Sequence, residues 1–471
     1  MSADDPDNQY QKIAVVILAA GLGTRMKSRT PKELQPVLGR PMLEYVLNAA
    51  DDPLITQRIV VLSPAKSAIA DRLPEGVAVA WQEEQLGTGH AAASAMDLLD
   101  DDITHVAVLF GDHPLLERSA ITSLVETAVE SGSLISLLTA VVEDPGAYGR
   151  VQRAAGQITG IVEARDDTRK YNGPVEIYSG ISCYERRWLD ANLPRIPRSS
   201  NQEYYLTALV EFAARNGDMS VPVVAVHADP SVAWGVNDRV DLAQAEQILR
   251  DRVVHYWMRE GVTIVDPAST FIEPGVEIGV DCRIEPFTII GGDTVIGEGS
   301  VIGPQSVVRD SRIGDDAHVV ASFLEGATVG SRVHIGPFSH LRAGAVLEDD
   351  AHVGNYAEIK NSQIGSWARV GHFRYVGDAS IGAHTNIGAG TVTCNYDGVD
   401  KHQTVVGSRA FIGSDTMLVA PVRVGDGAST GAGSVVTRDI GEGEVAYGVP
   451  AKTRKPKIEG QSEADRGGAA H

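Results

Sequence analysis

The C-terminal half of the chain, from about Ile264 to Val449 and Pro450, repeats aliphatic residues at intervals of six. Neither the 3.6-residue period of a helix nor the two-residue period of a strand explains this spacing. A hexapeptide period is typical of a parallel β-helix with three short strands per coil, in which the repeated aliphatic residue points inward. The rhythm lapses around residues 323–348 and 391–406, so we expect functional residues there. The repeats fall into these runs: Val295, Val301, Val307, Ile313 and Val319; Ile364, Val370 and Val376; Ile381 and Ile387; Ile412, Leu418, Val424, Thr430 and Val436.

The length of 471 residues predicts two or three domains. No apolar run approaches the roughly 20 residues that cross a bilayer, and the acidic N-terminus does not resemble a signal peptide. Three widely spaced cysteines predict no disulfide framework and favour a reducing, cytoplasmic location. The net charge of -21 argues against nucleic acid or a membrane as partner.

Residues 11–240 show the alternation of apolar strands and amphipathic helices that predicts an α/β domain with a Rossmann-like, doubly wound sheet. We expect a linker helix over 241–261, a β-helix over 262–455 and a disordered polar tail over 456–471. Within the first domain we expect strands at 13–18, 106–110 and 220–226 and helices at 41–50 and 90–99. Ligands of such sheets bind at the carboxyl ends of the strands.

A glycine-rich segment, LAAGLGTRM at 18–26, follows the first predicted strand. Gly21 and Gly23 would let the backbone approach a phosphate, and Arg25 and Lys32 would add cationic donors. An ordinary strand-to-helix turn is the alternative. The two cations at the carboxyl end of a strand favour a phosphate site.

Polar residues follow other predicted strands. Gln82 and Gln85 carry amides suited to reading a pyrimidine base, although the segment could be a plain polar loop. Asp112 ends the second strand and could hold Mg²⁺ with Asn237, whereas a lone aspartate is more often a cap. The phosphate loop nearby favours the metal interpretation.

The β-helix carries a second cluster on successive coils. Arg342 and Lys360 could form a cationic pocket for a sugar phosphate, and His372 could take a proton from an amine. Each residue alone could be a solvated surface group. Their placement on successive coils favours convergence on one face.

The motifs LAAGLGTRM, PKEL, QLGTGH, FGD, YGR, GIVE and GVN closely resemble the sugar-1-phosphate nucleotidyltransferases. With the hexapeptide domain, residues 11–450 resemble the family of bifunctional N-acetylglucosamine-1-phosphate uridyltransferases/glucosamine-1-phosphate acetyltransferases. The resemblance implies a left-handed β-helix and a cytoplasmic homotrimer. It further implies acetyl transfer from acetyl-CoA to glucosamine 1-phosphate, then uridylyl transfer from UTP to N-acetylglucosamine 1-phosphate, supplying peptidoglycan and lipopolysaccharide precursors.

The resemblance also implies roles for individual residues. In the first site, Arg25 and Lys32 would be catalytic and Asp112 and Asn237 would hold Mg²⁺, while further residues would bind substrate: Leu18, Ala19, Gly21, Gln82, Gln85, Gly87, Thr88, Gly149, Glu163 and Asn237. The family places Asn-Ser/Thr-Gly where this chain has Tyr178-Ser179-Gly180, so an amide that binds the sugar is missing or replaced.

For acetyl transfer, the resemblance implies His372 as general base. The sugar phosphate would be bound by Arg342, Lys360, Tyr375, Asn386 and Lys401, and acetyl-CoA by Ala389, Asn395, Tyr396, Ser414 and Ala432. Gly448 stands where the family often has Arg, and the basic segment 451–457 could supply the CoA phosphate contacts instead.

Two other interpretations remain open at this point. The β-helix could only oligomerise or regulate a nucleotidyltransferase, in which case His372 would not matter for activity. The whole chain could instead be a repeat scaffold that binds partners, although this would not explain the combination of Arg25, Lys32, Asp112 and Asn237.

Overall fold

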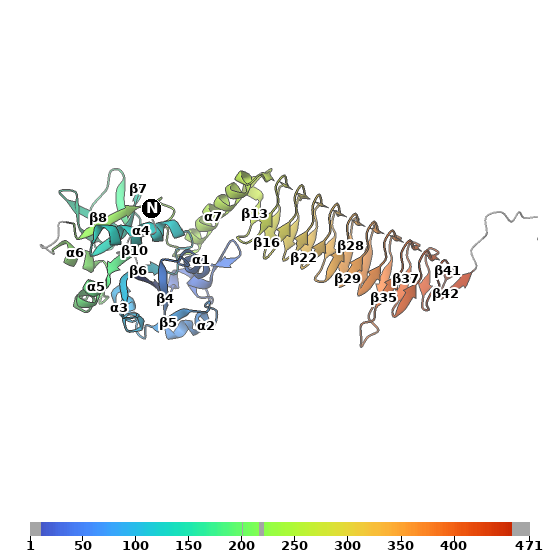
Figure 1. Cartoon of the computed structure of the whole chain (residues 1–471), viewed down its shortest axis with the longest axis horizontal. Helices are drawn as coiled ribbons and strands as arrows, with labels where there is room; N and C mark the ends of the chain where they lie inside the picture. Colours follow the sequence, from blue (N-terminus) through green and yellow to red (C-terminus); the bar gives the residue numbers. More distant parts are fainter. Residues whose placement is uncertain (1–10, 200, 216–220, 455–471) are drawn as a thin grey trace, which may run out of the picture. The chain divides into compact units, whose positions relative to one another are not determined.

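The computed structural model describes residues 11–199, 201–215 and 221–454, and it divides the chain into two compact units, Met1–Leu249 and Arg250–His471 (Figure 1). The predicted tail, 456–471, lies outside the described residues. Within the described part, no helix combines the length and the apolar character needed to span a bilayer.

A nine-stranded sheet forms the centre of the first unit, with the path β11-β7-β10-β6-β1-β4-β5 and β8 and β9 attached to β10. Its strands are β1 (Lys12–Leu18), β4 (Ile55–Leu62), β5 (Val77–Trp81), β6 (Ile103–Phe110), β7 (Ile135–Val142), β8 (Gly149–Ala154), β9 (Gln157–Val162), β10 (Val175–Glu185) and β11 (Val223–His227). The three predicted strands correspond to β1, β6 and β11. The pairs β11·β7, β6·β1, β1·β4 and β4·β5 are parallel. Strand β10 runs antiparallel to β6, β7 and β8, and β8 runs antiparallel to β9.

Helices cover both faces of this sheet. Ile13, Val15 and Ile17 share one core with α1 (Met42–Ala49), α2 (Ser67–Ala70) and α4 (Arg118–Ser131). Ala14, Val16 and Leu18 share the opposite core with α3 (Thr88–Ala93), α5 (Arg186–Asn192) and α6 (Ala208–Ala214). Alternate strand residues point to opposite faces, so a strand covered on both sides must be apolar throughout.

The helix predicted at 90–99 is shorter than expected. α3 ends at Ala93, and a separate 3-10 turn, η5 (Met96–Leu98), follows. The Ser94 hydroxyl donates to the carbonyl of His90 at 3.0 Å. Such back-bonding by serine slightly destabilises a helix and often bends it, which favours an end at this point.

Short elements complete the first unit: η2 (Thr24–Met26), η3 (Lys32–Leu34), β2 (Pro36–Val37), β3 (Arg40–Pro41), η4 (Pro64–Lys66) and η6 (Leu193–Arg195). The linker helix predicted at 241–261 corresponds to α7 (Arg239–Arg259), which runs across the division between Leu249 and Arg250.

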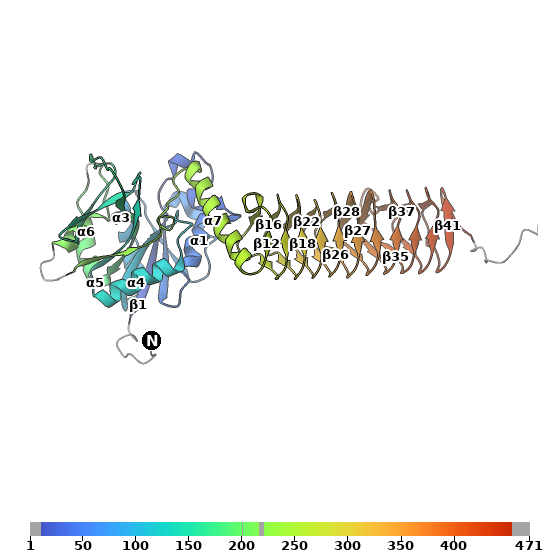
Figure 2. The same cartoon turned by 90° about the horizontal axis from the view of Figure 1, so that it is seen from above.

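The second unit consists of coils whose strands form three sheets, as expected for a parallel β-helix (Figure 2). The sheets are parallel except for the last pair, β41 and β42, which is antiparallel. Besides η7 (Pro267–Ser269), its elements are assigned as follows. Sheet 1 contains β12 (Thr263–Ile264), β15 (Arg283–Ile284), β18 (Val301–Ile302), β21 (His318–Val319), β24 (His334–Ile335), β27 (His352–Val353), β30 (Arg369–Val370), β33 (Asn386–Ile387), β36 (Phe411–Ile412), β39 (Ser429–Thr430), β41 (Val445–Gly448) and β42 (Ala451–Arg454). Sheet 2 contains β13 (Phe271–Ile272), β16 (Ile289–Gly291), β19 (Val307–Arg309), β22 (Phe323–Glu325), β25 (His340–Leu341), β28 (Ala357–Lys360), β31 (Arg374–Gly377), β34 (Val392–Cys394), β37 (Met417–Val419) and β40 (Val435–Val436). Sheet 3 contains β14 (Glu277–Ile278), β17 (Val295–Ile296), β20 (Arg312–Ile313), β23 (Thr328–Val329), β26 (Ala345–Leu347), β29 (Ser362–Ile364), β32 (Ala379–Ile381), β35 (Thr404–Val406) and β38 (Val422–Val424).

The aliphatic residues that point inward are those predicted from the six-residue period, except in the first run. There the core holds Ile296, Ile302 and Val308, each buried, whereas the preceding valines face outward and are half-buried. Each of these strands has two consecutive aliphatic residues, and only one of the two can point inward. The expectation that Val295, Val301 and Val307 point inward was therefore wrong by one position.

A column of small buried residues fills the corner between sheets 1 and 2, and it includes Ser322, Ser339, Ala357 and Thr391. Arg374 occupies the same position between Ala357 and Thr391, because β28, β31 and β34 are successive strands. Its Nε donates to the Gly388 carbonyl at 2.8 Å, as the Thr391 hydroxyl also does at 2.7 Å. Among the described contacts its Nη1 has no partner, and burial lowers its pKa to about 10.

Candidate active sites

Two adjoining cavities open at the carboxyl ends of the first unit's parallel strands. The cavity beside the glycine-rich loop, the loop cavity, has a volume of about 550 Å³, and its neighbour beside β10, the bulge cavity, about 360 Å³. Residues lining both are Arg25, Thr88, Phe110, Asp112, Arg165, Glu203, Tyr205 and Asn237. Two ligands bound side by side would therefore meet at this shared wall.

Three side chains of the shared wall, Arg25, Asp112 and Asn237, take part in polar contacts. Arg25 Nη2 donates to Asn237 Oδ1 at 2.8 Å, and Lys32 forms an ion pair with Asp112. Burial alone would raise the pKa of Asp112, but Lys32 and then His113 outweigh it and hold that pKa well below its usual range. The carboxylate is therefore ionised at neutral pH. The structure thus brings together the four residues that were expected to act on phosphate and metal.

The glycine-rich loop leaves the sheet directly after β1. Ala19 donates its backbone N–H to Val61 at 2.9 Å, which fixes the start of the loop. Gly23 has φ of 61°, and a Cβ there would lie 2.9 Å from the Cβ of Lys32. A Cβ on Gly21 would have no other atom within 4 Å apart from its chain neighbours. Leu18 and Gly21 line the loop cavity, while Ala19 is buried beneath it.

The amide segment lies in the wall of the loop cavity. Gln82 is buried, and its Nε2 contacts the Gly87 carbonyl at 3.2 Å and His90 Nδ1 at 3.1 Å. Gln85 is exposed and lines the same cavity. Thr88 accepts a hydrogen bond from the Leu206 backbone at 3.0 Å. Of the two predicted amides, Gln85 is the one whose side chain the protein does not already engage in a described hydrogen bond.

Gly149, Glu163 and Tyr178 line the bulge cavity. Tyr178 is buried, and its hydroxyl donates to the Gly180 carbonyl at 2.6 Å and contacts Ser182 Oγ at 2.9 Å. Burial raises the pKa of this phenol well above its usual value. The hydroxyl therefore serves the fold of β10 and does not replace the amide expected at this position.

In the β-helix, sheet 2 brings together several predicted residues. Arg342 Nη1 donates to Glu358 Oε1 at 2.9 Å, and Glu358 lies beside Tyr375 on the next strand. A close side-chain contact with Lys401 and the charge of the same ammonium lower the pKa of Lys360. Asn395 donates to Asp378 and lies 3.5 Å from the Tyr375 hydroxyl.

Four predicted residues form a column along the corner between sheets 1 and 2. Backbone hydrogen bonds place His372, Ala389, Ser414 and Ala432 at equivalent positions: Gly390 donates to His372, Asp415 to Ala389 and Gly433 to Ser414. The His372 ring is exposed and its Nδ1 contacts the side-chain oxygen of Asn355. The predicted base therefore lies in line with three residues expected to bind acetyl-CoA.

Asn386 and Tyr396 lie apart from these groups. Asn386 belongs to sheet 1, where it shares a hollow with His334, His352 and Arg369. Tyr396 is 60% exposed in the loop between β34 and β35, where it bridges to Lys401. A single chain thus does not bring Asn386 into contact with the sheet 2 cluster. Of the basic segment 451–457, residues 455–457 lie outside the described residues.

The comparisons with known proteins agree over most of the chain. Residues 15–169 match the MobA-like NTP transferase domain, and residues 267–355 match the GMPPB C-terminal domain. "Bifunctional protein GlmU" of Heliobacterium modesticaldum is 45% identical, with 92% of this chain and 95% of the relative covered. The chain belongs to the GlmU family. Proteins of the same name from Pelobacter propionicus and Nocardia farcinica are each 42% identical, covering 95% and 94% of this chain and 97% and 92% of the relatives.

Membership of the GlmU family confirms the expected bifunctional enzyme of UDP-N-acetylglucosamine synthesis, a uridyltransferase and acetyltransferase that supplies a peptidoglycan precursor. Its nucleotidyl transfer requires a divalent metal. Among the described residues, no cluster of three or more His, Cys, Asp and Glu could hold a metal. The carboxylate of Asp112 and the amide oxygen of Asn237, both at the shared wall, are hard oxygen donors that fit an ion whose other ligands are water and phosphate.

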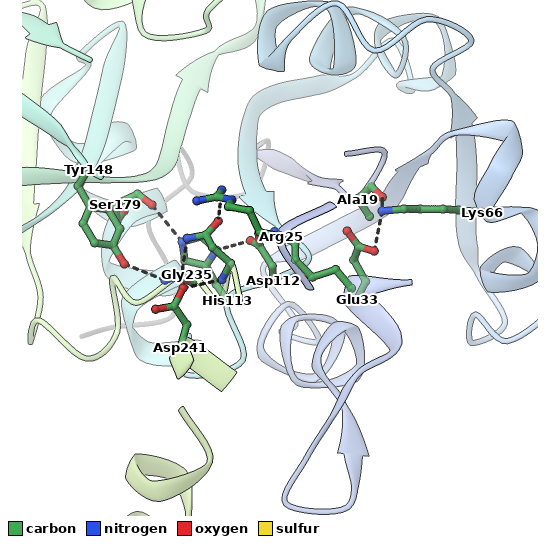
Figure 3. Close-up of polar contacts among 12 residues, drawn as sticks. Ala19, Arg25, Glu33, Lys66, Asp112, His113, Tyr148, Ser179, Gly235 and Asp241 are labelled. Carbon is green, nitrogen blue, oxygen red and sulfur yellow. Dashed lines mark hydrogen bonds and ion pairs between the residues drawn. The ribbon is translucent and has the colours of Figure 1, made fainter. Parts of the chain in front are cut away.

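Three residues of the GlmU chain escaped the sequence analysis. Arg165 lines both cavities with no described hydrogen bond or ion pair. Lys66 is buried beneath the loop, where it donates to the Ala19 carbonyl at 2.8 Å and to Glu33 at 2.6 Å (Figure 3). His113 contacts Asp112. Only His113 carried a signal, since it directly follows the predicted metal ligand.

Proposed function

We propose that the first unit performs the uridylyl transfer at the shared wall of its two cavities. UTP would occupy the loop cavity, with its phosphates against Arg25 and Lys32 and its base near Gln85. N-acetylglucosamine 1-phosphate would occupy the bulge cavity beside Gly149 and Glu163. The single observation that supports this assignment is that the two cavities meet at Arg25, Asp112 and Asn237.

The attacking group is a sugar-phosphate oxygen, which is an anion at neutral pH and needs no general base. It forms a bond to the α-phosphorus of UTP while the bond to pyrophosphate breaks. Arg25 and Lys32 orient the phosphates and neutralise charge, which is the main requirement of such transfers. Mg²⁺ held by Asp112 and Asn237 would add positive charge at the phosphate oxygens.

We also propose that the β-helix performs the acetyl transfer. Arg342, Lys360 and Lys401 would bind the phosphate of glucosamine 1-phosphate, and the His372 ring would accept the proton that the sugar amine loses as it attacks the thioester. The column from Ala389 through Ser414 to Ala432 would line acetyl-CoA. The amide C–N bond forms as the C–S bond breaks, and coenzyme A leaves as the thiol.

The separation of Asn386 from the sheet 2 cluster supports a homotrimer of C3 symmetry, because sheet 1 of one copy would complete the site on sheet 2 of another. We further propose that the β-helix is left-handed and that the enzyme is cytoplasmic. A monodisperse, fully active monomer in light scattering would refute the trimer.

Two substitutions test the division of labour. With UTP, Mg²⁺, acetyl-CoA and glucosamine 1-phosphate supplied together, thiol and pyrophosphate are measured separately. We expect His372→Ala to abolish thiol release, and pyrophosphate to return when N-acetylglucosamine 1-phosphate is added. Asp112→Asn should abolish pyrophosphate release and leave thiol release intact. Exposed His255→Ala and Asp71→Asn serve as controls. If His372→Ala retained full thiol release, the β-helix assignment would be wrong.

A further inference from the structure

His113 joins two walls of the bulge cavity and has no role in the mechanism proposed above. The residue directly follows Asp112, is 6% exposed and lines that cavity. Its Nδ1 lies 2.9 Å from Asp112 Oδ1, and its Nε2 lies 3.1 Å from the carbonyl oxygen of Ser179 (Figure 3). One buried ring thus connects the end of β6 to β10.

Both partners of the ring are hydrogen-bond acceptors. A carboxylate and a carbonyl offer lone pairs but no proton, so the ring must donate the hydrogen bond at either contact, and it makes both bonds at once only when both of its nitrogens carry a proton. The bond to Asp112 fixes the direction in which the remaining carboxylate lone pairs point. Hydrogen-bond partners behind a metal ligand set its orientation, and their loss typically costs about 10- to 100-fold in metal affinity.

The ring is held in place by its surroundings. A Cβ on Gly235 would lie 2.8 Å from Cε1 of the ring, so glycine there allows the backbone to cover the imidazole. Phe110 packs against the ring at 5.7 Å between centroids. Gly235 in turn donates to the Tyr148 hydroxyl at 3.0 Å. The turn that carries Asn237 therefore lies against the same ring.

The Ser179 carbonyl is available because β10 is irregular there. The register with β7 shifts between Tyr178 and Ser182, which removes the intervening residues from the ladder. Ser179 Oγ donates to Leu138 at 2.8 Å and accepts from the Ile181 backbone at 3.1 Å. These bonds and that of the Tyr178 hydroxyl shape the bulge. The described contact of the Ser179 carbonyl is the one with His113.

We propose that His113 is a positioning residue for uridylyl transfer, with one ring nitrogen serving the metal site and the other the sugar site. Nδ1 orients Asp112 toward the divalent metal, and Nε2 holds the β10 bulge that forms the wall of the sugar cavity. The inference rests on the proposed uridylyl site. It differs from a packing role, because a packing role would affect stability without separating metal affinity from sugar affinity.

Two substitutions separate the two nitrogens. The amide nitrogen of His113→Asn can take the place of Nδ1, and that of His113→Gln the place of Nε2. Mn²⁺ binding to the full chain is measured directly by electron paramagnetic resonance, and KM for N-acetylglucosamine 1-phosphate from pyrophosphate release. We expect His113→Asn to keep Mn²⁺ affinity within about 2-fold of the wild type and to raise the KM for the sugar phosphate roughly 10-fold. We expect His113→Gln to keep that KM and to weaken Mn²⁺ binding roughly 10-fold.

Differential scanning calorimetry of the full chain reports whether the first unit of each variant folds, and thiol release from acetyl-CoA, which the β-helix would perform, should stay unchanged. The proposal would be overturned if both variants shifted Mn²⁺ affinity and sugar KM in parallel, or shifted neither. Asp112→Asn distinguishes this failure from that of the proposed site. If Asp112→Asn left Mn²⁺ affinity unchanged, the metal site itself would be wrong, and an unaltered sugar KM in His113→Asn would then refute the role of Nε2 as well.

Discussion

Lys66 forms a buried ion pair beneath the glycine-rich loop. We expect the loss of stability on its replacement by a neutral residue to depend strongly on pH. Lys66 and Glu33 have side chains 7% and 3% exposed and lie 2.6 Å apart. Burial raises the pKa of Glu33 in spite of Lys66, and burial lowers the pKa of Lys66 in spite of Glu33. For each group, loss of water therefore outweighs the attraction of its partner.

Lys66→Met would leave the Glu33 carboxylate buried without its described cation. Removing one partner of a buried pair typically costs about 3–5 kcal/mol. For a unit of this size each kcal/mol corresponds to roughly 2–4 °C, so we expect its unfolding temperature to fall by about 10 °C at pH 8. Replacing both residues, as Glu33→Gln with Lys66→Met, should restore stability to within about 1 kcal/mol of the wild type.

The sign of the pH dependence follows from Glu33. Its folded pKa is raised above the ordinary 4.5, and loss of Lys66 would raise it further. A raised folded pKa contributes stability below the unfolded pKa, and this stability is lost as pH rises through the folded pKa. The deficit of Lys66→Met should therefore be smaller at pH 5 than at pH 8.

Differential scanning calorimetry of the full chain at both pH values measures this, with exposed Lys170→Met as the matched control. A Lys66→Met variant that melts with the control at pH 8 would refute the reasoning. So would a deficit that is the same at pH 5 and pH 8, because Glu33 could then not be the source.

Three further substitutions have defined outcomes. Arg374→Thr should raise the unfolding temperature of the β-helix unit, because a threonine there could bond the carbonyl three residues back, that of Gly371, as Thr391 bonds that of Gly388. The change also removes an unpaired buried nitrogen, which costs about 1–3 kcal/mol. Gly87→Ala should lower the rate of uridylyl transfer at least roughly 10-fold and leave acetyl transfer unchanged. The reason is that Gly87 has φ of 100° and that a Cβ there would lie 2.7 Å from the backbone oxygen of Tyr204. Tyr178→Phe should destabilise the first unit by about 1 kcal/mol and raise the sugar KM, because it removes the hydroxyl that shapes the bulge.

Calorimetry and the two product assays check these outcomes. A lower melting point in Arg374→Thr would mean that the guanidinium stabilises the corner. Unchanged pyrophosphate release in Gly87→Ala would show that the loop tolerates a side chain. An unaltered sugar KM in Tyr178→Phe would separate the bulge from sugar binding.

The fold was predictable where the pattern is local. A hexapeptide period dictates three strands per coil, and continuous apolar runs such as Ile13–Leu18 require a sheet covered on both faces. Two features of the β-helix could not be predicted from the period alone. The first is the inward register of the first run, which depends on which of two adjacent aliphatic residues faces the core. The second is the variation in coil length: the coil from Ile284 to Ile302 has 18 residues, whereas that from Ile302 to Val319 has 17.

The proximity of the candidate residues was predictable where they follow strands of one sheet. Arg25, Lys32, Asp112 and Asn237 meet because their segments leave the same edge. Lys66 escaped prediction because its partners, Ala19 and Glu33, lie 47 and 33 residues away in sequence. Contacts of that kind are set by tertiary packing and leave no periodic trace in the sequence.

The lapse in the six-residue rhythm at 391–406 explains how the second site acquires its charge. Ile387 and Ile412 occupy equivalent positions on sheet 1, yet 25 residues separate them, whereas 17 separate Val370 from Ile387. The additional residues form the loop that places Lys401 beside Lys360, whose pKa falls because the two ammonium groups repel each other. Such repulsion destabilises the empty site and is relieved when an anion binds between the cations. The two neighbouring cations are in keeping with the proposal that a sugar phosphate binds here.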